Sequence, residues 1–417
     1  TGTLKPILGY LMLAAGAGVI VSNLDPLGKM IEHGFHITGV VPNNEAIVAV
    51  AQKVLGVETM SILVVGLLMN LLIARFTKFK YVFLTGHHSL FMACLMSAVL
   101  GTAGLSGIEL ILVGGFLMGA WSAISPAIGQ SYTSKVTDGD EIALGHFGSL
   151  GYYLSAWVAK YVGKAEESTE DIEIPEKWGF LRDSTLSTAL TMIVFYLIAA
   201  IAAGSEFVAT LSGSMSPYLF AVMSAMNFAV GVAIVYSGVR MILGDLIPAF
   251  QGIATKIIPN AIPAVDCAVF FTYAPTAVVL GFISSFIGGI IGMLILGAVG
   301  GVLIIPGLVP HFFCGATAGI YGNATGGRRG AAVGAFLNGL AITFLPALAL
   351  PVLGQLGFQN TTFGDADFAV MGLVLGNAFE WIGMAGIYGV VVIAALVLII
   401  PNFIKTKGKV INYVEEE

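Results

Sequence analysis

The sequence predicts an all-α protein that crosses a lipid bilayer many times, and two observations carry this prediction. Of the 417 residues, 57% are hydrophobic and only 10% are charged, whereas a soluble domain carries about 25% charged residues. Several runs of about 20 residues have no charged side chain, and this length crosses roughly 30 Å of hydrocarbon. The net charge of −6 gives no indication of a nucleic-acid partner.

Ten segments are long and apolar enough to be membrane spans: 4–22, 58–76, 81–101, 107–129, 187–204, 217–243, 274–296, 306–325, 329–350 and 380–402. Two shorter Gly-rich stretches, 142–160 and 368–379, are bounded by polar residues and predict re-entrant hairpins. The segments 24–56 and 244–262 mix charges, prolines and apolar residues, which is typical of interfacial amphipathic helices. Because the sequence opens on Thr1 rather than Met, we expect further residues, up to a whole span, to precede it.

The chain consists of two related halves, separated by a polar loop at 164–186. Ser125-Pro-Ala-Ile-Gly-Gln130 matches Leu350-Pro-Val-Leu-Gly-Gln355, and Gly139-Asp140 matches Gly364-Asp365, both at an offset of 225. A duplicated unit explains this most simply. The matching interrupted segments are 81–90 with 306–315 and 138–150 with 363–377.

The basic residues indicate that the two copies are inverted. Arg75, Lys78 and Lys80 have no basic counterpart at 300–305, whereas Arg328 and Arg329 have none at 102–108. Lys and Arg favour the cytoplasmic side, so the copies should face opposite ways; Lys29 and Lys53 do not fit this rule. Inverted repeats with broken helices are a secondary-transporter architecture with the solute site between the repeats.

The stretch 259–275 places one carboxylate, Asp266, in an apolar run that contains three prolines. The prolines make an unbroken helix unfavourable. A carboxylate beside irregular backbone in a membrane indicates a polar cavity or a partner, so we expect Asp266 to lie in a solute site. The alternative is that Asp266 caps the next helix at an interfacial turn.

Two histidine motifs could also contact a solute. In Thr85-Gly86-His87-His88, one histidine could hydrogen-bond a hydroxylated solute, or could be a structural residue bonded to backbone. The same alternatives hold for His146, next to which freed backbone N–H groups could bind an anion. Adjacent histidines point to different faces, so we expect no metal site. No motif predicts a catalytic residue or a cofactor.

Other motifs favour structural roles. Cys94, Cys267 and Cys314 lie far apart in apolar sequence and indicate packing rather than disulfides. Gly115-xxx-Gly119 and Gly288-xxx-Gly292 favour close helix packing. Glu380 is interpreted as an interfacial anchor at the start of the last span. Four aspartates are interpreted as turn or cap residues: Asp138, Asp140, Asp365 and Asp367.

The sequence also resembles a known family along essentially its whole length. The resemblance rests on Leu84-Thr-Gly-His87, Leu144-Gly-His146, Gly238-Val-Arg-Met241, Pro248-Ala-Phe-Gln-Gly-Ile253, Asp266-Cys267, Tyr273-Ala-Pro275, Val309-Pro-His-Phe-Phe-Cys-Gly-Ala-Thr-Ala-Gly319 and Gly322-Asn-Ala-Thr-Gly-Gly-Arg-Arg329. Together these runs resemble the ascorbate-type enzyme IIC permeases of the bacterial phosphotransferase system. Galactitol-type permeases are more distant relatives.

The resemblance implies a homodimer in the bacterial plasma (inner) membrane, in which a core domain moves against a V-shaped dimerisation domain. The dimerisation domain would comprise 1–45 and 187–258, with 380–417, and the core 46–163 and 259–379. The implied solute is L-ascorbate, which a separate IIB protein phosphorylates from a phosphocysteine charged by IIA. The implied substrate-binding residues are Thr85, Gly86, His87, Gly145, His146 and Asp266.

Some positions depart from the family pattern. Other members carry glutamine where this chain has Phe91 and Phe147, and the segment before Glu45 is hard to align. These three positions are therefore further candidates for contact with the solute. Their departure from the family pattern also affects which solute the protein is expected to bind. Two alternatives remain: the same mechanism with another sugar acid or a polyol such as galactitol, and an ion-coupled secondary transporter.

Overall fold

The computed structural model describes residues 4–36, 39–42, 44–139, 141–172, 184–256, 258–354 and 361–403. Some helical side chains, among them those of 45–54 and 242–255, lie outside this description. The elements follow in the order α1 (Leu4–Gly34), β1 (Val41–Pro42), α2 (Asn44–Phe76), β2 (Tyr81–Phe83), α3 (Gly86–Thr102), α4 (Gly107–Val136), β3 (Ala143–Leu144), α5 (Ser149–Val162), α6 (Ser184–Ala203), α7 (Ser205–Ser212), α8 (Pro217–Lys256), β4 (Ile262–Val265), a 3-10 helix (Cys267–Thr272), α9 (Pro275–Ala298), α10 (Leu308–Gly354), β5 (Thr361–Thr362), α11 (Ala366–Ile382), α12 (Met384–Ile399) and a 3-10 helix (Ile400–Phe403).

The described part of the chain is a polytopic membrane protein built almost entirely from helices. Seven of its helices are long and apolar enough to cross a membrane, or eight if α6 and α7, bent by 117° at Gly204, form one span. The prediction of ten spans is therefore too high. One reason is that 81–101 contains a strand and the 17-residue helix α3. The predicted spans 306–325 and 329–350, by contrast, correspond to the two helical parts of α10, which Gly326 and Gly327 separate with non-helical backbone angles.

Two predicted interfacial helices are parts of longer helices. Helix α1 continues without a break through Pro26 to Gly34, and α8 continues to Lys256. The charged residues that predicted an interfacial helix at 24–56 include Asp25 and Lys29, which both belong to α1. Lys29 Nζ is 2.8 Å from Asp25 Oδ2. A pair at i and i+4 lies on one helix face and compensates both charges, so the charges do not end the helix.

The last predicted span begins later than expected. Helix α11 extends to Ile382, and Gly383, with φ of 65°, separates it from α12. Positive φ strains other residue types, so glycine suits this break. Glu380 therefore lies exposed in the last turn of α11 rather than at the start of the final span.

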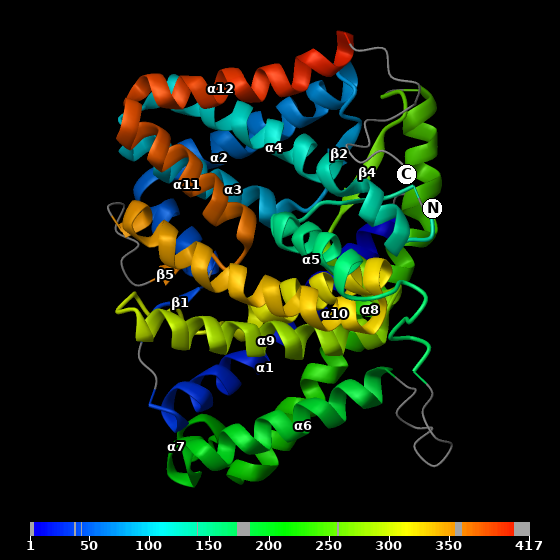
Figure 1. Cartoon of the computed structure of the whole chain (residues 1–417), viewed down its shortest axis with the longest axis vertical. Coiled ribbons are helices and arrows are strands. Elements are labelled where there is room, and N and C mark those ends of the chain that lie inside the picture. Colours follow the sequence, from blue (N-terminus) through cyan, green and yellow to red (C-terminus); the bar gives the residue numbers. More distant parts are fainter. Residues whose placement is uncertain are drawn as a thin grey trace.

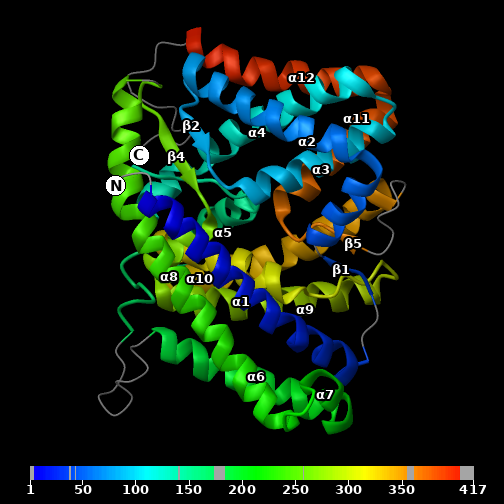
Figure 2. The same ribbon diagram turned by 180° about the vertical axis from the view of Figure 1, so that it is seen from behind.

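The helices form two apolar cores along the long axis of the molecule (Figures 1 and 2). One core joins α1, α6 and α8 to α5, α9 and α10, with Leu24, Phe228 and Phe312 among its fully buried side chains. The other joins α2, α3 and α4 to α11 and α12. Helix α12 packs on α4 and α11, at the opposite end of the molecule from α6 and α7 (Figure 1).

A short parallel sheet lies between the two cores and was not predicted. Its strand order is β2-β4-β3, with Phe83 and Ala143 both beside Ala264. Side chains alternate across a strand. Accordingly, Ala143 and Ala264 face the core of α2–α4, whereas Leu144 and Val265 face the other core. The sheet therefore ties together segments that are up to about 180 residues apart in the chain. A second pair, β1 with β5, is also parallel.

The predicted glycine motifs do allow close helix packing. A Cβ on Gly119 would lie 2.7 Å from the Gly66 carbonyl oxygen of α2, and a Cβ on Gly288 would lie 2.2 Å from the Phe336 carbonyl oxygen of α10. Such distances are closer than atoms can approach. Glycine therefore permits the α2–α4 and α9–α10 contacts, and this prediction is confirmed.

Candidate functional site

The candidate site lies at the carboxyl ends of the three parallel strands. Strand β2 leads to Thr85, Gly86 and His87, β3 leads to Gly145 and His146, and β4 leads to Asp266. Because parallel strands run in the same direction, their carboxyl ends meet at one edge. The sheet thus explains why polar residues from three distant segments come together.

A cavity of about 810 Å³ opens at this edge. Its wall comes from 84–88, 91, 146, 266 and 268 on one side and from 305–310, 313 and 365 on another. The predicted matching segments therefore do meet around one space, together with the proline-rich stretch. Helix α1 and Asn44 of α2 complete the wall. The volume is within the range of small-molecule sites.

Asp266 lies where strand β4 ends and a 3-10 helix begins. Its Oδ1 accepts a hydrogen bond from the Ala268 N–H at 3.1 Å, and its Oδ2 lies 3.4 Å from His87 Nε2. The Asp266 side chain is 8% exposed, whereas that of His87 is 53% exposed. Asp266 therefore caps the short helix and also borders the cavity.

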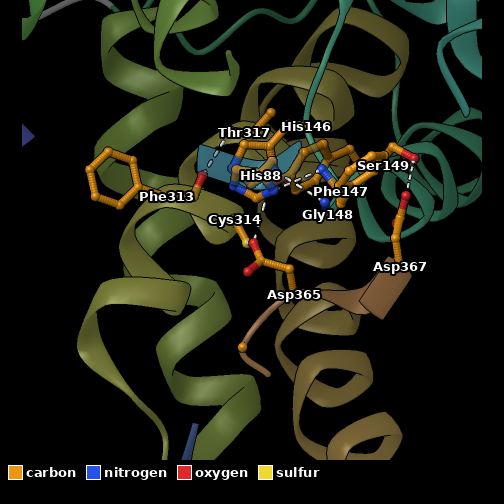
Figure 3. Close-up of polar contacts among 12 residues, drawn as sticks. His88, His146, Phe147, Gly148, Ser149, Phe313, Cys314, Thr317, Asp365 and Asp367 are labelled. Atoms are coloured by element: carbon orange, nitrogen blue, oxygen red, sulfur yellow. Dashed lines mark hydrogen bonds and ion pairs between the residues drawn. The ribbon is translucent and has the colours of Figure 1, made fainter. Parts of the chain in front are cut away.

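His88 and His146 lie against each other, with ring centroids 3.7 Å apart (Figure 3). His88 Nδ1 accepts from the Phe147 N–H at 3.2 Å. His146 Nδ1 accepts from the Gly148 N–H at 3.1 Å and is 2.8 Å from the Tyr152 hydroxyl. A neutral imidazole that accepts at Nδ1 carries its proton on Nε2. Each ring is therefore fixed by backbone and keeps an Nε2–H as a donor.

Asp365 brings a second carboxylate to the cavity. It accepts from Asn44 Nδ2 at 2.7 Å. It also accepts from Cys314 Sγ at 2.9 Å (Figure 3). Asp365 lies at the N-cap position of α11, in keeping with its interpretation as a turn or cap residue, but its side chain makes no capping hydrogen bond to that helix. Its Oδ1 is 3.9 Å from His146 Nδ1, which is too long for a hydrogen bond.

Asp367, by contrast, does not line the cavity but stabilises the segment that carries His146. It is fully buried and accepts from Ser149 Oγ at 2.7 Å, the Leu150 N–H at 2.9 Å and Trp121 Nε1 at 3.2 Å. Ser149 and Leu150 begin α5, so Asp367 caps that helix from a distant segment. A carboxylate is favourable at a helix N-terminus. This contact fixes the loop that carries His146.

Six of the nine candidate residues line the cavity: Thr85, Gly86, His87, Phe91, His146 and Asp266. The Thr85 Oγ1 is buried and has no hydrogen-bond partner among the described residues. Gly145 lies outside the wall. Its N–H donates to the Val265 carbonyl at 2.7 Å, and a Cβ there would lie 2.3 Å from the Ala264 carbonyl oxygen. Gly145 thus permits the close approach of two strands.

Phe147 and Glu45 are placed differently. Phe147 is fully buried and stacks on Phe83, with ring centroids 4.5 Å apart. It reaches the site through its backbone, which donates to His88. Glu45 belongs to the first turn of α2, but its side chain lies outside the described part of the chain.

No sequence pattern distinguished the role of His88 from that of His87. Asp365 and Asn44 were not predicted to lie at the site. The repeat offered a signal for Asp365, since Gly364-Asp365 aligns with a polar break of the first copy. Among the described residues, His88, His146 and Asp365 each place a potential metal-ligand atom within 4.8 Å of the others. The spacing of adjacent histidines could not reveal this group, because its members come from three segments.

Together, many apolar helices and a polar cavity formed at interrupted segments are typical of integral-membrane permeases. The chain belongs to the family of sugar-specific permease components of the phosphotransferase system, whose model matches residues 1–367. It is a multi-pass protein of the bacterial plasma membrane.

One relative has a name that is more specific than that of the family. Over 384 residues the chain is 25% identical to the ascorbate-specific phosphotransferase-system EIIC component of Mycoplasma pneumoniae (strain ATCC 29342 / M129 / Subtype 1). The match covers 78% of this chain and 57% of that relative. The chain therefore spans less than two thirds of the relative's length.

Proposed function

We propose that this chain translocates L-ascorbate across the membrane as the IIC permease of a phosphotransferase system. The observation that carries the proposal is the convergence of Thr85, His87, His146 and Asp266 on one cavity. Histidine N–H groups and a threonine hydroxyl can donate, and carboxylates can accept, so a compact solute with several hydroxyls finds complementary partners. The name of the Mycoplasma relative supports ascorbate among such solutes.

The proposal includes the partners that the family mechanism requires. IIB would phosphorylate the solute at the cytoplasmic face from a phosphocysteine that IIA has charged. The three cysteines of this chain are all buried, which supports placing that phosphocysteine on another protein. The permease would act as a homodimer of inverted-repeat protomers, with α1, α6, α7 and α8 in the dimerisation domain and the sheet and its helices in the moving core.

The direct test is equilibrium binding of radiolabelled L-ascorbate to the purified protein, with galactitol and sugar acids as competitors. We expect saturable binding that only unlabelled ascorbate displaces. Asp266→Ala should abolish this binding without changing the oligomeric state, because it removes an acceptor for the solute and the partner of His87. Glu166→Ala, which removes an exposed carboxylate from the polar loop, is the matched control and should bind normally.

Each other outcome points to a different conclusion. Displacement by galactitol but not ascorbate would replace the solute and keep the permease class. Normal affinity in Asp266→Ala would refute the site. In proteoliposomes, solute accumulation without phosphoenolpyruvate and IIB, driven by an ion gradient, would favour the ion-coupled alternative.

A further inference from the structure

Helix α1 contributes a charged stripe to the cavity. Asp25, Lys29 and Glu32 all line it, and their spacing of four and three residues places them on one face of the helix. All three lie within the candidate span Ile7–Gly34. Charged residues in a span are costly, are rare, and usually mark a solute or ion pathway. The charged stripe of Asp25, Lys29 and Glu32 is therefore a candidate for contact with the solute.

Lys29 is the only lysine or arginine among the described residues of the cavity wall. The wall also carries four carboxylates, those of Asp25, Glu32, Asp266 and Asp365. The sheet edge itself presents histidines and carboxylates but no permanent cation. An anionic solute that enters this space would thus be repelled from most of the wall unless it lies near Lys29.

The Lys29 ammonium has capacity to bind such a solute. It has three N–H donors; it pairs with Asp25 Oδ2 at 2.8 Å and also interacts electrostatically with the neighbouring Glu32 carboxylate. The Lys29 side chain is 53% exposed, although it lies beside the cavity in a membrane helix. It can therefore turn from Asp25 to a solute oxygen without crossing a packed region.

We propose that Lys29 is a specificity-determining residue that supplies the cationic contact to an anionic, hydroxylated solute. The sheet edge would bind the hydroxyl groups, and α1 would bind the charge. The solute would thereby join α1, which packs with α6 and α8, to the edge of the sheet that lies between the two cores. This inference rests on the proposed function and specifies which residue selects an acid over a neutral polyol.

The test compares ascorbate binding to purified full-length variants by equilibrium dialysis. Lys29→Met keeps the length of the side chain and removes the charge, and we expect its affinity to fall tenfold or more. Lys29→Arg keeps the charge and should stay within about threefold of wild type. Asp25→Asn removes the competing carboxylate, so its affinity should rise. Lys135→Met, which removes an exposed lysine at the end of α4, is the matched control and should not change binding.

Affinity should fall in Lys29→Met and rise in Asp25→Asn. A folding defect would weaken binding in both variants, so it could not produce this pair of results. Wild-type affinity in a monodisperse Lys29→Met protein would overturn the inference and leave the proposed function intact. If wild-type protein binds galactitol and not ascorbate, the proposed solute fails. If it binds neither, the proposed function fails at the binding step.

Discussion

At the scale of single residues, the site depends on side chains that serve two neighbours at once. Asp266 caps a 3-10 helix with one oxygen and faces His87 with the other. His146 accepts two hydrogen bonds at Nδ1, so its Nε2–H is oriented before any solute arrives. Such prior orientation lowers the entropy cost of binding. His88, His146 and Asp266 are therefore oriented by backbone N–H groups.

Asp367 gives the first stability prediction. Asp367→Ala would leave the Ser149 hydroxyl, the Leu150 N–H and the Trp121 indole N–H without their acceptor in a buried place. An unsatisfied buried donor costs about 1–3 kcal/mol. We expect a marked fall in Tm in detergent solution, together with weaker solute binding because the His146 loop is released.

Asp367→Asn is the matched comparison, since the amide oxygen can still accept one of these bonds. It should lower the Tm less than Asp367→Ala does. Equal Tm values for Asp367→Ala and wild type would show that the contact does not stabilise the fold.

The sequence could predict part of this residue-level picture. A charged residue such as Asp266 in an apolar, proline-bracketed run is conspicuous, and so are His87 and His146 beside glycines. Asp365 and Asp367 were interpreted as turn or cap residues, which is the usual role of aspartate outside helices. Their actual partners, Cys314 and Ser149, lie 51 and 218 residues away in the chain. Local spacing contains no information about contacts of that range.

At the scale of elements, close helix contact at glycines replaces much of the side-chain packing. Along α9 and α10, a Cβ on Gly281 would lie 2.4 Å from the Gly315 carbonyl oxygen, and one on Gly339 would lie 2.0 Å from the Ser285 carbonyl oxygen. Small residues let backbones approach where lipid gives no hydrophobic drive for association. These contacts hold α10, which carries part of the cavity wall, in place.

We expect Gly288→Ala to destabilise the protein, because its Cβ would meet the Phe336 carbonyl oxygen, which cannot move without the whole of α10. Overpacking of this kind costs about 1–3 kcal/mol. Gly389→Ala in α12 is the control, since nothing lies within 4 Å of its added Cβ. Thermal unfolding followed by tryptophan fluorescence compares them; an equal Tm for both variants would refute the packing argument.

Helices and strands were not equally predictable. The runs that became α4 and α9 are apolar, long and bounded by polar or proline residues, so composition was enough. Strands β2, β3 and β4 have two to four residues each, and their apolar character is indistinguishable from that of a helix. Only the three prolines of 259–275 indicated that a helix would be broken near β4. The charges within α1 were taken to indicate an interfacial helix at 24–56, but they face a cavity rather than the membrane surface.

At the scale of the whole molecule, the cavity lies between helix α1 on one side and the sheet edge with α10 on the other. Composition established the class of protein, and the repeat indicated which segments would meet. Transport requires that this space open to each side of the membrane in turn. A rigid movement of the two bodies against each other would achieve this, as the family architecture implies.

Accessibility of one cavity residue tests such a movement. We expect Gly28→Cys to react with a membrane-impermeant maleimide in both right-side-out and inverted vesicles, and L-ascorbate should change the ratio of the two rates. Background labelling should be low, because Cys94, Cys267 and Cys314 are buried. Glu166→Cys, in the polar loop, should react from one side only. A ratio at Gly28→Cys that ascorbate leaves unchanged would contradict alternating access.

The central strand of the sheet also constrains how the protein is made. β4 pairs with both β2 and β3, yet it is synthesised last, after more than 100 further residues have followed β3. Until then, the two outer strands leave backbone N–H and C=O groups without partners, which is costly in hydrocarbon. The nascent chain must therefore keep these segments in water, against the insertion machinery or beside other helices until the second half arrives. Biogenesis of the site is consequently a late event that the first half of the chain cannot complete alone.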